Sequence, residues 1–305
     1  MSKNFLQELK NYNIDIRENV LLSKYTTLNI GGPAKYFAFI NNIDELQTIL
    51  KLVKLYKENL LIIGAGSNML IADEGFNGVV IKLKGEFCKI EVNDKTVTAF
   101  AGVMLPMLIK TAIDYSLSGL EELYGIPGTI GGCVIMNAGT KTATISDNIE
   151  YIEVMNINEP EIGVIKLKKE DINFGYRKSG LEEEYVIIKA VFNLKSSEKE
   201  KLIERINEVL LNRMKTQPLG TFNVGCIFKN PSKDISSAKL IEECGLKGYS
   251  IGDAYISEKH ANFIINRNNA KAEDFISLIR YIIKAVKEKF NIELEPEIKI
   301  IGLKI

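Results

Sequence analysis

The sequence predicts an α+β fold, with strands and helices mixed along the whole chain. Short apolar runs of strand length occur in both halves, and amphipathic segments with helical spacing of apolar residues lie between them. Their order lacks the regular strand–helix alternation of a doubly wound parallel sheet. A chain of 305 residues is long enough for two or three domains, and 46% apolar with 26% charged residues is ordinary for a globular protein.

The first half is expected to open with a short amphipathic helix and a connector within residues 1–25. Asn42 and Glu45 form a capping-box pattern at the start of the first long helix. Pro106 stands in the first turn of the second, where proline is tolerated. The expected strands cover residues 35–40, 60–63, 78–83, 89–92 and 96–100, and the expected long helices cover 42–58 and 105–115.

The second half continues the mixture. Ser197 and Glu200 form another capping-box pattern, and Gln217-Pro218 ends the helix that follows, so we place a domain boundary there. The expected strands cover residues 149–156, 164–167, 185–194, 226–228, 261–266 and 298–303, and the expected helices cover 197–214, 237–244 and 272–290.

Bulk properties exclude several classes of protein. Lysine plus arginine and aspartate plus glutamate balance at 39 each, which gives no sign of a nucleic-acid or membrane-surface partner. No apolar run approaches the roughly 18 residues of a membrane span, and the N-terminal residues lack a signal-peptide core, so we expect a cytoplasmic protein. One histidine and four scattered cysteines (Cys88, Cys133, Cys226 and Cys244) argue against a zinc site or other metal centre.

The stretch YGIPGTIGGCVIMNAG, residues 124–139, contains five glycines. Glycine lets the backbone approach a ligand closely, and inward-facing amides form an anion-binding concavity suited to a diphosphate. The alternative is a pair of structural turns flanking a buried strand at residues 133–136. A second glycine-rich loop, residues 64–68, follows an apolar strand and favours the ligand-binding interpretation. It is not a dinucleotide fingerprint, because Met69 stands where the last glycine of that motif belongs.

Three further motifs carry residue types suited to chemistry. Arg177 lies in a glycine-flanked turn and could clamp a carboxylate, Cys226 follows a glycine, and Glu297 follows a proline before an apolar strand. By spacing alone, each has an ordinary alternative: a solvated arginine, a thiol packed as a small hydrophobe, and an exposed glutamate. His260, the only histidine, is expected to be structural or to hydrogen-bond a substrate rather than to carry a proton.

Seven stretches in order, from Tyr25 to Gly302, resemble the UDP-N-acetylenolpyruvoylglucosamine reductases, flavoenzymes of bacterial cell-wall synthesis. The matching motifs are TTLNIGGPA, LIIGAGSNMLIAD, GIPGTIGGCVIMNAG, FGYRKSG, GCIFKNP, HANFIIN and LEPEIKIIG. The resemblance implies a vanillyl-alcohol-oxidase-type (PCMH-type) FAD-binding fold. Its parts would be a first FAD-binding subdomain at 1–85, a second at 86–215, and an α+β substrate-binding domain at 216–305. The short spacing after Arg177 suggests the family's short form, which lacks a tyrosine-carrying inserted loop.

The resemblance also assigns residues. Arg177, Glu297 and Cys226 match the catalytic positions, and Cys226 stands where many members have a serine proton donor. The residues expected to bind the cofactor are Gly64, Ala65, Gly66, Ser67, Asn68, Pro127, Gly128, Thr129, Gly131, Gly132, Asn137, Ala138 and Gly139. Those expected to bind substrate are Tyr176, Arg213, Gln217, Lys229, Asn230 and His260.

The implied activity is NADPH-dependent, FAD-mediated reduction of UDP-N-acetylglucosamine enolpyruvate to UDP-N-acetylmuramate, a step of peptidoglycan synthesis. FAD is expected to be non-covalent, because no histidine lies near either glycine loop. The expected partner is therefore a UDP-sugar, with no nucleic acid, membrane or obligate protein partner. Two alternatives stay open at this point: another FAD-dependent oxidoreductase of the same fold, and a non-catalytic nucleotide-binding module.

Overall fold

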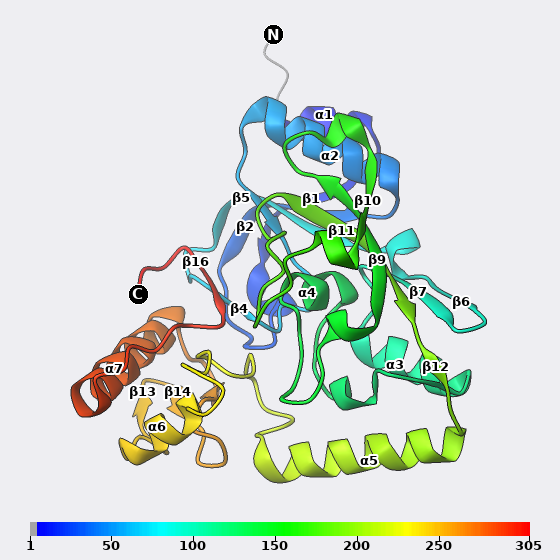
Figure 1. Cartoon of the computed structure of the whole chain (residues 1–305). Helices are drawn as coiled ribbons and strands as arrows, with labels where there is room; N and C mark the ends of the chain where they lie inside the picture. Colours follow the sequence, from blue (N-terminus) through cyan, green and yellow to red (C-terminus); the bar gives the residue numbers. More distant parts are fainter. Residues whose placement is uncertain (1–4) are drawn as a thin grey trace. The chain divides into compact units, whose positions relative to one another are not determined.

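The computed structural model describes residues 5–305, and Figure 1 shows the course of the chain. The first four residues of the expected N-terminal helix lie outside the described part. Contacts divide the chain into two compact units, each assembled from separate segments. Unit 1 contains the chain up to Glu18, Tyr36–Ala65 and Gly78–Leu211, and unit 2 contains Asn19–Lys35, Gly66–Asn77 and Asn212–Ile305. The expected boundaries near residues 85 and 215 stay a prediction.

Unit 1 is built on a five-stranded antiparallel sheet in the order β10-β9-β11-β7-β6. Alternating burial along β7 places Val97 and Ala99 in the core beneath the sheet. The helices α3 and α4 contribute to the same core, and α4 packs against β11. The elements are β6 (Ile90–Asn93), β7 (Thr96–Phe100), α3 (Leu105–Asp114), α4 (Ile130–Ile135), β9 (Ile149–Asn156), β10 (Val164–Lys168) and β11 (Tyr185–Asn193).

A second core of unit 1 lies around α2 and the parallel strand pair β3–β5. Asn42 caps α2 as expected, because its Oδ1 accepts a hydrogen bond of 2.9 Å from the amide of Glu45. Strands β3 and β5 belong to a four-stranded sheet in the order β1-β2-β5-β3. The elements are α1 (Phe5–Asn11), β1 (Asp15–Leu21), β2 (Pro33–Ile40), α2 (Ile43–Tyr56), β3 (Leu60–Ile62) and β5 (Phe76–Leu83).

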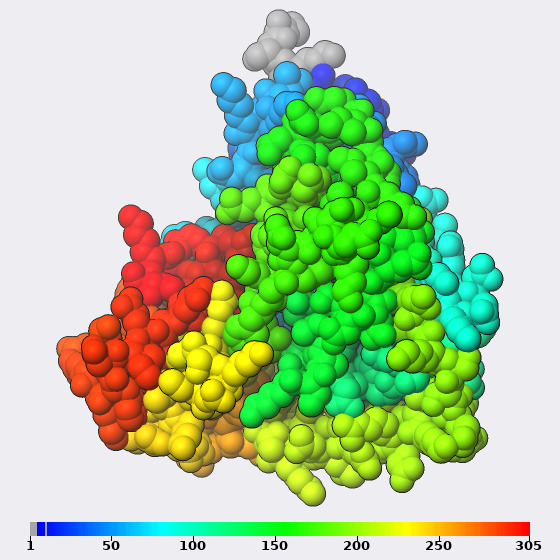
Figure 2. All heavy atoms as spheres, in the orientation of Figure 1, coloured from blue at the N-terminus to red at the C-terminus, as the bar shows by residue number. Residues whose placement is uncertain are grey.

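Helix α5 (Lys199–Thr216) is mostly exposed, and Leu202 is its one fully buried residue. Figure 2 shows its side chains on the surface at the bottom of the view. Before it, the short strand β12 (Lys195–Ser196) pairs with β8 (Leu117–Ser118).

Unit 2 is organised around α7 (Ala272–Phe290), whose buried face repeats at helical spacing through Phe275, Ile279, Ile282 and Val286. This face shares a core with the antiparallel sheet β13-β14-β15. Asn291, in the left-handed region, ends the helix. The other elements are β4 (Met69–Ile71), α6 (Ser237–Glu243), β13 (Ser250–Ile251), β14 (Ala254–Ile256), β15 (Ile264–Asn266) and β16 (Lys299–Ile301), and β16 pairs in parallel with β4.

The α+β class is confirmed, but two local expectations are wrong. Residues 226–228 form no strand: their one ladder pairing in the described structure is a single bridge from Phe228 to Pro296. The side chain of Asn262 replaces a neighbouring strand, because it accepts from the amide of Phe228 at 2.9 Å and donates to its carbonyl at 2.8 Å. The possible strand at residues 133–136 is instead largely the short helix α4.

Like Asn262, Asn266 in unit 2 satisfies backbone groups with its side chain, and this gives a prediction about stability. It is 2% exposed, donates to the carbonyl of Leu28 at 2.9 Å, and accepts from the amides of Asn268 and Ala270. Asn266→Ala should lower the free energy of unfolding by about 2–4 kcal/mol, because buried backbone groups lose their partner. Urea unfolding measures this. Asn268→Ala, at an exposed position, is the matched control, and an equal loss in both variants would contradict the assignment.

Candidate active site

The two glycine-rich stretches meet inside unit 1. Strand β3 ends at Ile62, and the chain then brings Gly64 against Thr129, which is buried at the start of α4. A Cβ atom built on Gly64 would overlap Thr129 Oγ1, so a residue with a side chain cannot occupy this position without moving its neighbour. Absence of a side chain at residue 64 therefore permits the contact between the loops, and this contact fits a shared ligand.

Two glycines of the second stretch also have a packing role. The amide of Gly131 donates to the carbonyl of Ala101 at 2.9 Å, and a Cβ on Gly131 would lie 3.1 Å from the Cβ of Ala101. A Cβ on Gly139 would lie 2.5 Å from the carbonyl oxygen of Ala143. These two glycines are thus explained by packing within unit 1.

Asn137, near the end of this stretch, provides an independent sign of a ligand. Its backbone lies in the left-handed region, at φ 41°, and its side chain is 5% exposed. Nδ2 donates to the carbonyl of Gly175 at 2.9 Å, whereas Oδ1 is buried and has no hydrogen-bond partner among residues 5–305. A buried acceptor without a donor is rare, so this atom fits a donor of a bound group such as FAD.

The carbonyl of Gly175, which Asn137 contacts, belongs to the loop that carries Arg177. Gly175 and Lys178 form a tight hairpin, and Arg177 within it has φ 57°, a left-handed conformation that is uncommon for arginine. At the far end, the carboxylate of Glu182 accepts from the amides of Ser179 and Gly180 at 3.0 and 3.3 Å. Burial by itself would raise the pKa of Glu182, but these backbone hydrogen bonds together outweigh it and hold the pKa below its usual value. The guanidinium lies 5.2 Å from the ring of Tyr176, which is about half exposed.

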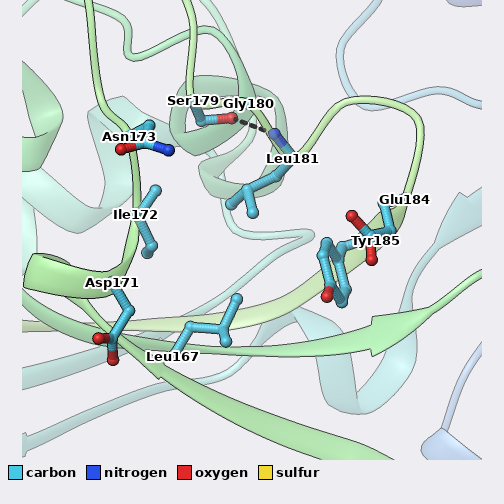
Figure 3. A pocket seen from close by; sticks show the side chains of 9 residues that line it. All are labelled: Leu167, Asp171, Ile172, Asn173, Ser179, Gly180, Leu181, Glu184 and Tyr185. Atoms are coloured by element: carbon cyan, nitrogen blue, oxygen red, sulfur yellow. Dashed lines mark hydrogen bonds between the residues drawn. The ribbon is translucent and has the colours of Figure 1, made fainter.

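A cavity of about 220 Å³ lies beside this loop (Figure 3). The amide of Leu181 donates to Ser179 Oγ at 3.3 Å on its wall. None of the residues expected to bind cofactor or to act in catalysis lines it. Its walls are Leu167, Asp171, Ile172, Asn173, Ser179, Gly180, Leu181, Glu184 and Tyr185.

In unit 2, the second half of the first glycine loop meets the segment of Glu297. Gly66 has φ 64°, and a Cβ there would overlap the carbonyl of Tyr25. Asn68 Nδ2 donates to the carbonyl of Glu297 at 3.2 Å, and the amide of Lys299 donates to the carbonyl of Asn68 at 3.0 Å. An expected cofactor residue and the expected catalytic glutamate are therefore brought together.

The segment of Cys226 also contacts Glu297. The amide of Glu297 donates to the carbonyl of Ile227 at 2.7 Å, next to Cys226 in the chain. Arg213 is close enough for its charge to interact with the Cys226 thiolate; burial lowers the pKa of the Arg213 guanidinium, and that thiolate opposes the shift. Arg213 Nε and Gln217 Oε1 are buried without hydrogen-bond partners in the described part of the chain, which fits a polar substrate.

Three expected substrate residues make contacts within unit 2. Lys229 Nζ forms an ion pair of 2.6 Å with Glu295, and Asn230 Oδ1 accepts from the amide of Ser237. Burial lowers the pKa of His260, partly opposed by a backbone hydrogen bond, so its imidazole is neutral at pH 7. Its Nδ1 accepts from the amide of Asn262 at 3.3 Å, which is consistent with a hydrogen-bonding role.

The contact of Lys82 with the first glycine loop was not predicted from the sequence: its Nζ donates to the carbonyl of Gly64. The signal was present: a lysine follows the apolar run VVI at the end of β5. The contacts of Glu182 and Asn262 were not predicted either, because their partners are backbone groups that the sequence does not reveal.

Two family models match segments of this chain, and they define its class as an FAD-binding oxidoreductase. A family model described as an FAD binding domain matches residues 34–161, and one described as the UDP-N-acetylenolpyruvoylglucosamine reductase C-terminal domain matches 217–301. The first range includes both glycine loops, and the second includes Gln217, Cys226 and Glu297.

Whole proteins agree with these models. A UDP-N-acetylenolpyruvoylglucosamine reductase of Caldicellulosiruptor saccharolyticus is 43% identical over 98% of this chain and 96% of its own. That of Clostridium novyi is 38% identical over 94% and 92%. The crystal structure of the reductase (MurB) from Thermus caldophilus has a TM-score of 0.81 at 37% identity and covers 95% of this chain and 99% of its own. The chain belongs to the UDP-N-acetylenolpyruvoylglucosamine reductase family, and the expected FAD-binding fold is confirmed. No helix within residues 5–305 has the length and apolar character of a membrane span.

The contact at Gly64 gives a prediction about the cofactor. Gly64→Ala should raise the dissociation constant for FAD at least about tenfold, because the new methyl group displaces Thr129 or the loop itself. Flavin fluorescence titration of the flavin-stripped protein measures this. The double variant Gly64→Ala/Thr129→Ala should recover part of the loss because the clashing hydroxyl is gone. No recovery would mean that the overlap with Thr129 is not the cause.

Proposed function

We propose that this chain reduces UDP-N-acetylglucosamine enolpyruvate to UDP-N-acetylmuramate in peptidoglycan synthesis, with NADPH as the reductant. Family membership supports this reaction. The main structural observation in support of the cofactor site is the contact between the two glycine loops at Gly64 and Thr129. When bound, FAD would supply the hydride-transfer chemistry between NADPH and the enolpyruvyl double bond. The expected cofactor residues of both loops would hold it without a covalent bond.

Arg177 is proposed to bind the carboxylate of the enolpyruvyl group. Negative charge develops at the carbon next to this carboxylate, and a bidentate guanidinium stabilises it. A left-handed arginine costs about 1–3 kcal/mol of backbone strain and persists only where its surroundings enforce it, which is typical of functional positions. The hairpin at Gly175 and the bonds of Glu182 provide that enforcement.

Glu297 and Cys226, both in unit 2, are proposed to supply the remaining catalytic roles. Glu297, as a neutral acid, would donate a hydrogen bond to the developing negative charge. Cys226 would protonate the carbon and so fix its stereochemistry. The backbone bond between Glu297 and Ile227 supports the pairing of these two roles within unit 2.

The UDP-sugar is proposed to bind through Arg213 and Gln217, with Tyr176, Lys229, Asn230 and His260. The buried unpartnered atoms of Arg213 and Gln217 support this, because a diphosphate or sugar would satisfy them. We further propose that the protein is of the family's short form and acts without an obligate protein partner. Its proposed location is the cytoplasm, where NADPH and nucleotide sugars are available.

The two half-reactions test the proposed roles. Arg177→Lys loses the planar fork, and Glu297→Gln changes the acidity of the donor. Both should slow flavin reoxidation by the enolpyruvyl sugar nucleotide by roughly 10²–10³-fold, while reduction of the bound flavin by NADPH stays within about twofold. Stopped-flow flavin absorbance separates the two steps.

The controls for this test are Lys178→Arg and Glu293→Gln, at exposed neighbouring positions. An equal loss in both half-reactions would refute the roles of Arg177 and Glu297. A wild-type protein that binds FAD but does not turn over the enolpyruvyl substrate would refute the proposed reaction.

Cys226 gives a separate prediction. Cys226→Ala should lower turnover by roughly 10²–10⁴-fold, the usual range for a general acid, with flavin reduction unchanged. A thiolate cannot donate a proton, so wild-type turnover should fall as rising pH ionises the thiol. Cys226→Ser should flatten this limb and retain substantial turnover, and Cys244→Ser is the control. Near-wild-type turnover by Cys226→Ala, with an unchanged pH profile, would show that the thiol only packs in the site.

A further inference from the structure

Lys82 lies on β5, beside the end of β3, where the chain leaves β3 and enters the first glycine loop. Ile81 pairs with Ile62 at the end of the parallel ladder, and Lys82 is the next residue of β5. Its Nζ donates to the carbonyl of Gly64, the same residue whose missing side chain admits Thr129. One lysine therefore touches the backbone at the contact between the two loops.

The charge of Lys82 is poorly compensated within the protein. Lys82 is partly buried and forms no ion pair with a carboxylate in the described chain. Elsewhere in unit 1, Lys189, with a side chain 22% exposed, pairs with Glu153 at 3.0 Å. Placing an ammonium ion in such a position without a counter-ion costs free energy, so an anion from outside the chain would be bound favourably there.

The hydrogen bond to Gly64 also orients the next amide. A trans peptide is planar, and its carbonyl and amide groups point in opposite directions. Because the carbonyl of Gly64 points to Lys82, the amide N–H of Ala65 points away from the lysine. The ammonium polarises this peptide, so its N–H is a stronger donor to an anion.

We infer that Lys82 is a positioning residue for the diphosphate of FAD, acting through the Gly64–Ala65 peptide and through its own positive charge. Its side chain fixes the carbonyl of Gly64, presents the amide of Ala65 to the diphosphate, and gains a counter-charge when the cofactor binds. The inference rests on the proposed use of FAD and adds a residue to its site.

Replacement of the lysine tests this. Lys82→Met keeps the length and removes the charge and the donor, so the dissociation constant for FAD should rise roughly 10-fold to 100-fold. Lys82→Arg keeps the charge and should recover much of the affinity. Lys84→Met, directly after the end of β5 and at an exposed position, should leave affinity at neutral pH unchanged. The measurement is titration of the flavin-stripped full-length protein with FAD, by flavin fluorescence.

A second readout separates positioning from a purely structural role. Without FAD, Lys82→Met should melt at the same temperature as the wild type or higher, because it removes a poorly compensated charge. With saturating FAD, the wild type should gain more in melting temperature than the variant, since ligand stabilisation follows affinity. A structural lysine would instead lower the melting temperature of the flavin-free protein.

The pH profile supplies a third readout. Burial, followed by the neighbouring charge of Lys84, lowers the pKa of Lys82, and the Cys88 thiolate opposes this. Of the two strands beside β5, residues 60–65 of β3 and its loop contribute no ionisable side chain, whereas β2 carries Lys35 and Tyr36. The charged form binds the diphosphate, so FAD affinity should fall as rising pH deprotonates Lys82, and the fall should begin below the ordinary lysine pKa of about 10.4. Lys82→Met should lack this fall, and Cys88→Ser should retain it.

An FAD dissociation constant of Lys82→Met within twofold of wild type would overturn the inference. So would a melting temperature of the flavin-free variant that falls as far as that of the FAD complex. A wild-type protein that binds no FAD would instead refute the proposed cofactor, so the two failures are distinguishable.

Discussion

The contact between Gly64 and Thr129 is the constraint on which the arrangement of the two glycine loops in unit 1 depends. Strands β3 and β5 end there, α4 begins there, and the amide of Ile130 is fixed by the carbonyl of Val103 at 2.8 Å. A single additional methyl group on residue 64 would overlap Thr129 Oγ1, although the two residues lie some sixty positions apart in the sequence. The loops therefore work as one surface because a side chain is missing, and not because of a strong attraction between them.

Sequence reasoning succeeded where local signals decide the structure. Residues within each element are enough to explain the period of buried residues in α7, the cap of α2 and the alternation of β7. It failed at residues 226–228, because the polar groups of Phe228 are satisfied by a side chain 34 residues away. It also missed β4, a three-residue strand whose partner β16 lies at the other end of the chain.

The candidate site divides in the same way. The motifs around Arg177, Cys226 and Glu297 are recognisable as ordered sequence patterns, and membership of the reductase family follows from them and from the relatives. Contacts made by backbone carbonyls, such as that of Lys82 with Gly64, have no sequence pattern. Only the coordinates reveal them, because every residue type offers the same carbonyl.

Asn137 shows how one such carbonyl decides the polarity of a binding surface. An amide side chain has a donating and an accepting end, and its orientation follows from its partners. The carbonyl of Gly175 can only accept, so Nδ2 must face it and Oδ1 must face the other way. A bound molecule at this position therefore meets an acceptor, and a molecule that offers a lone pair there is rejected. The polarity that Asn137 presents is therefore set by a backbone carbonyl 38 residues further along the chain.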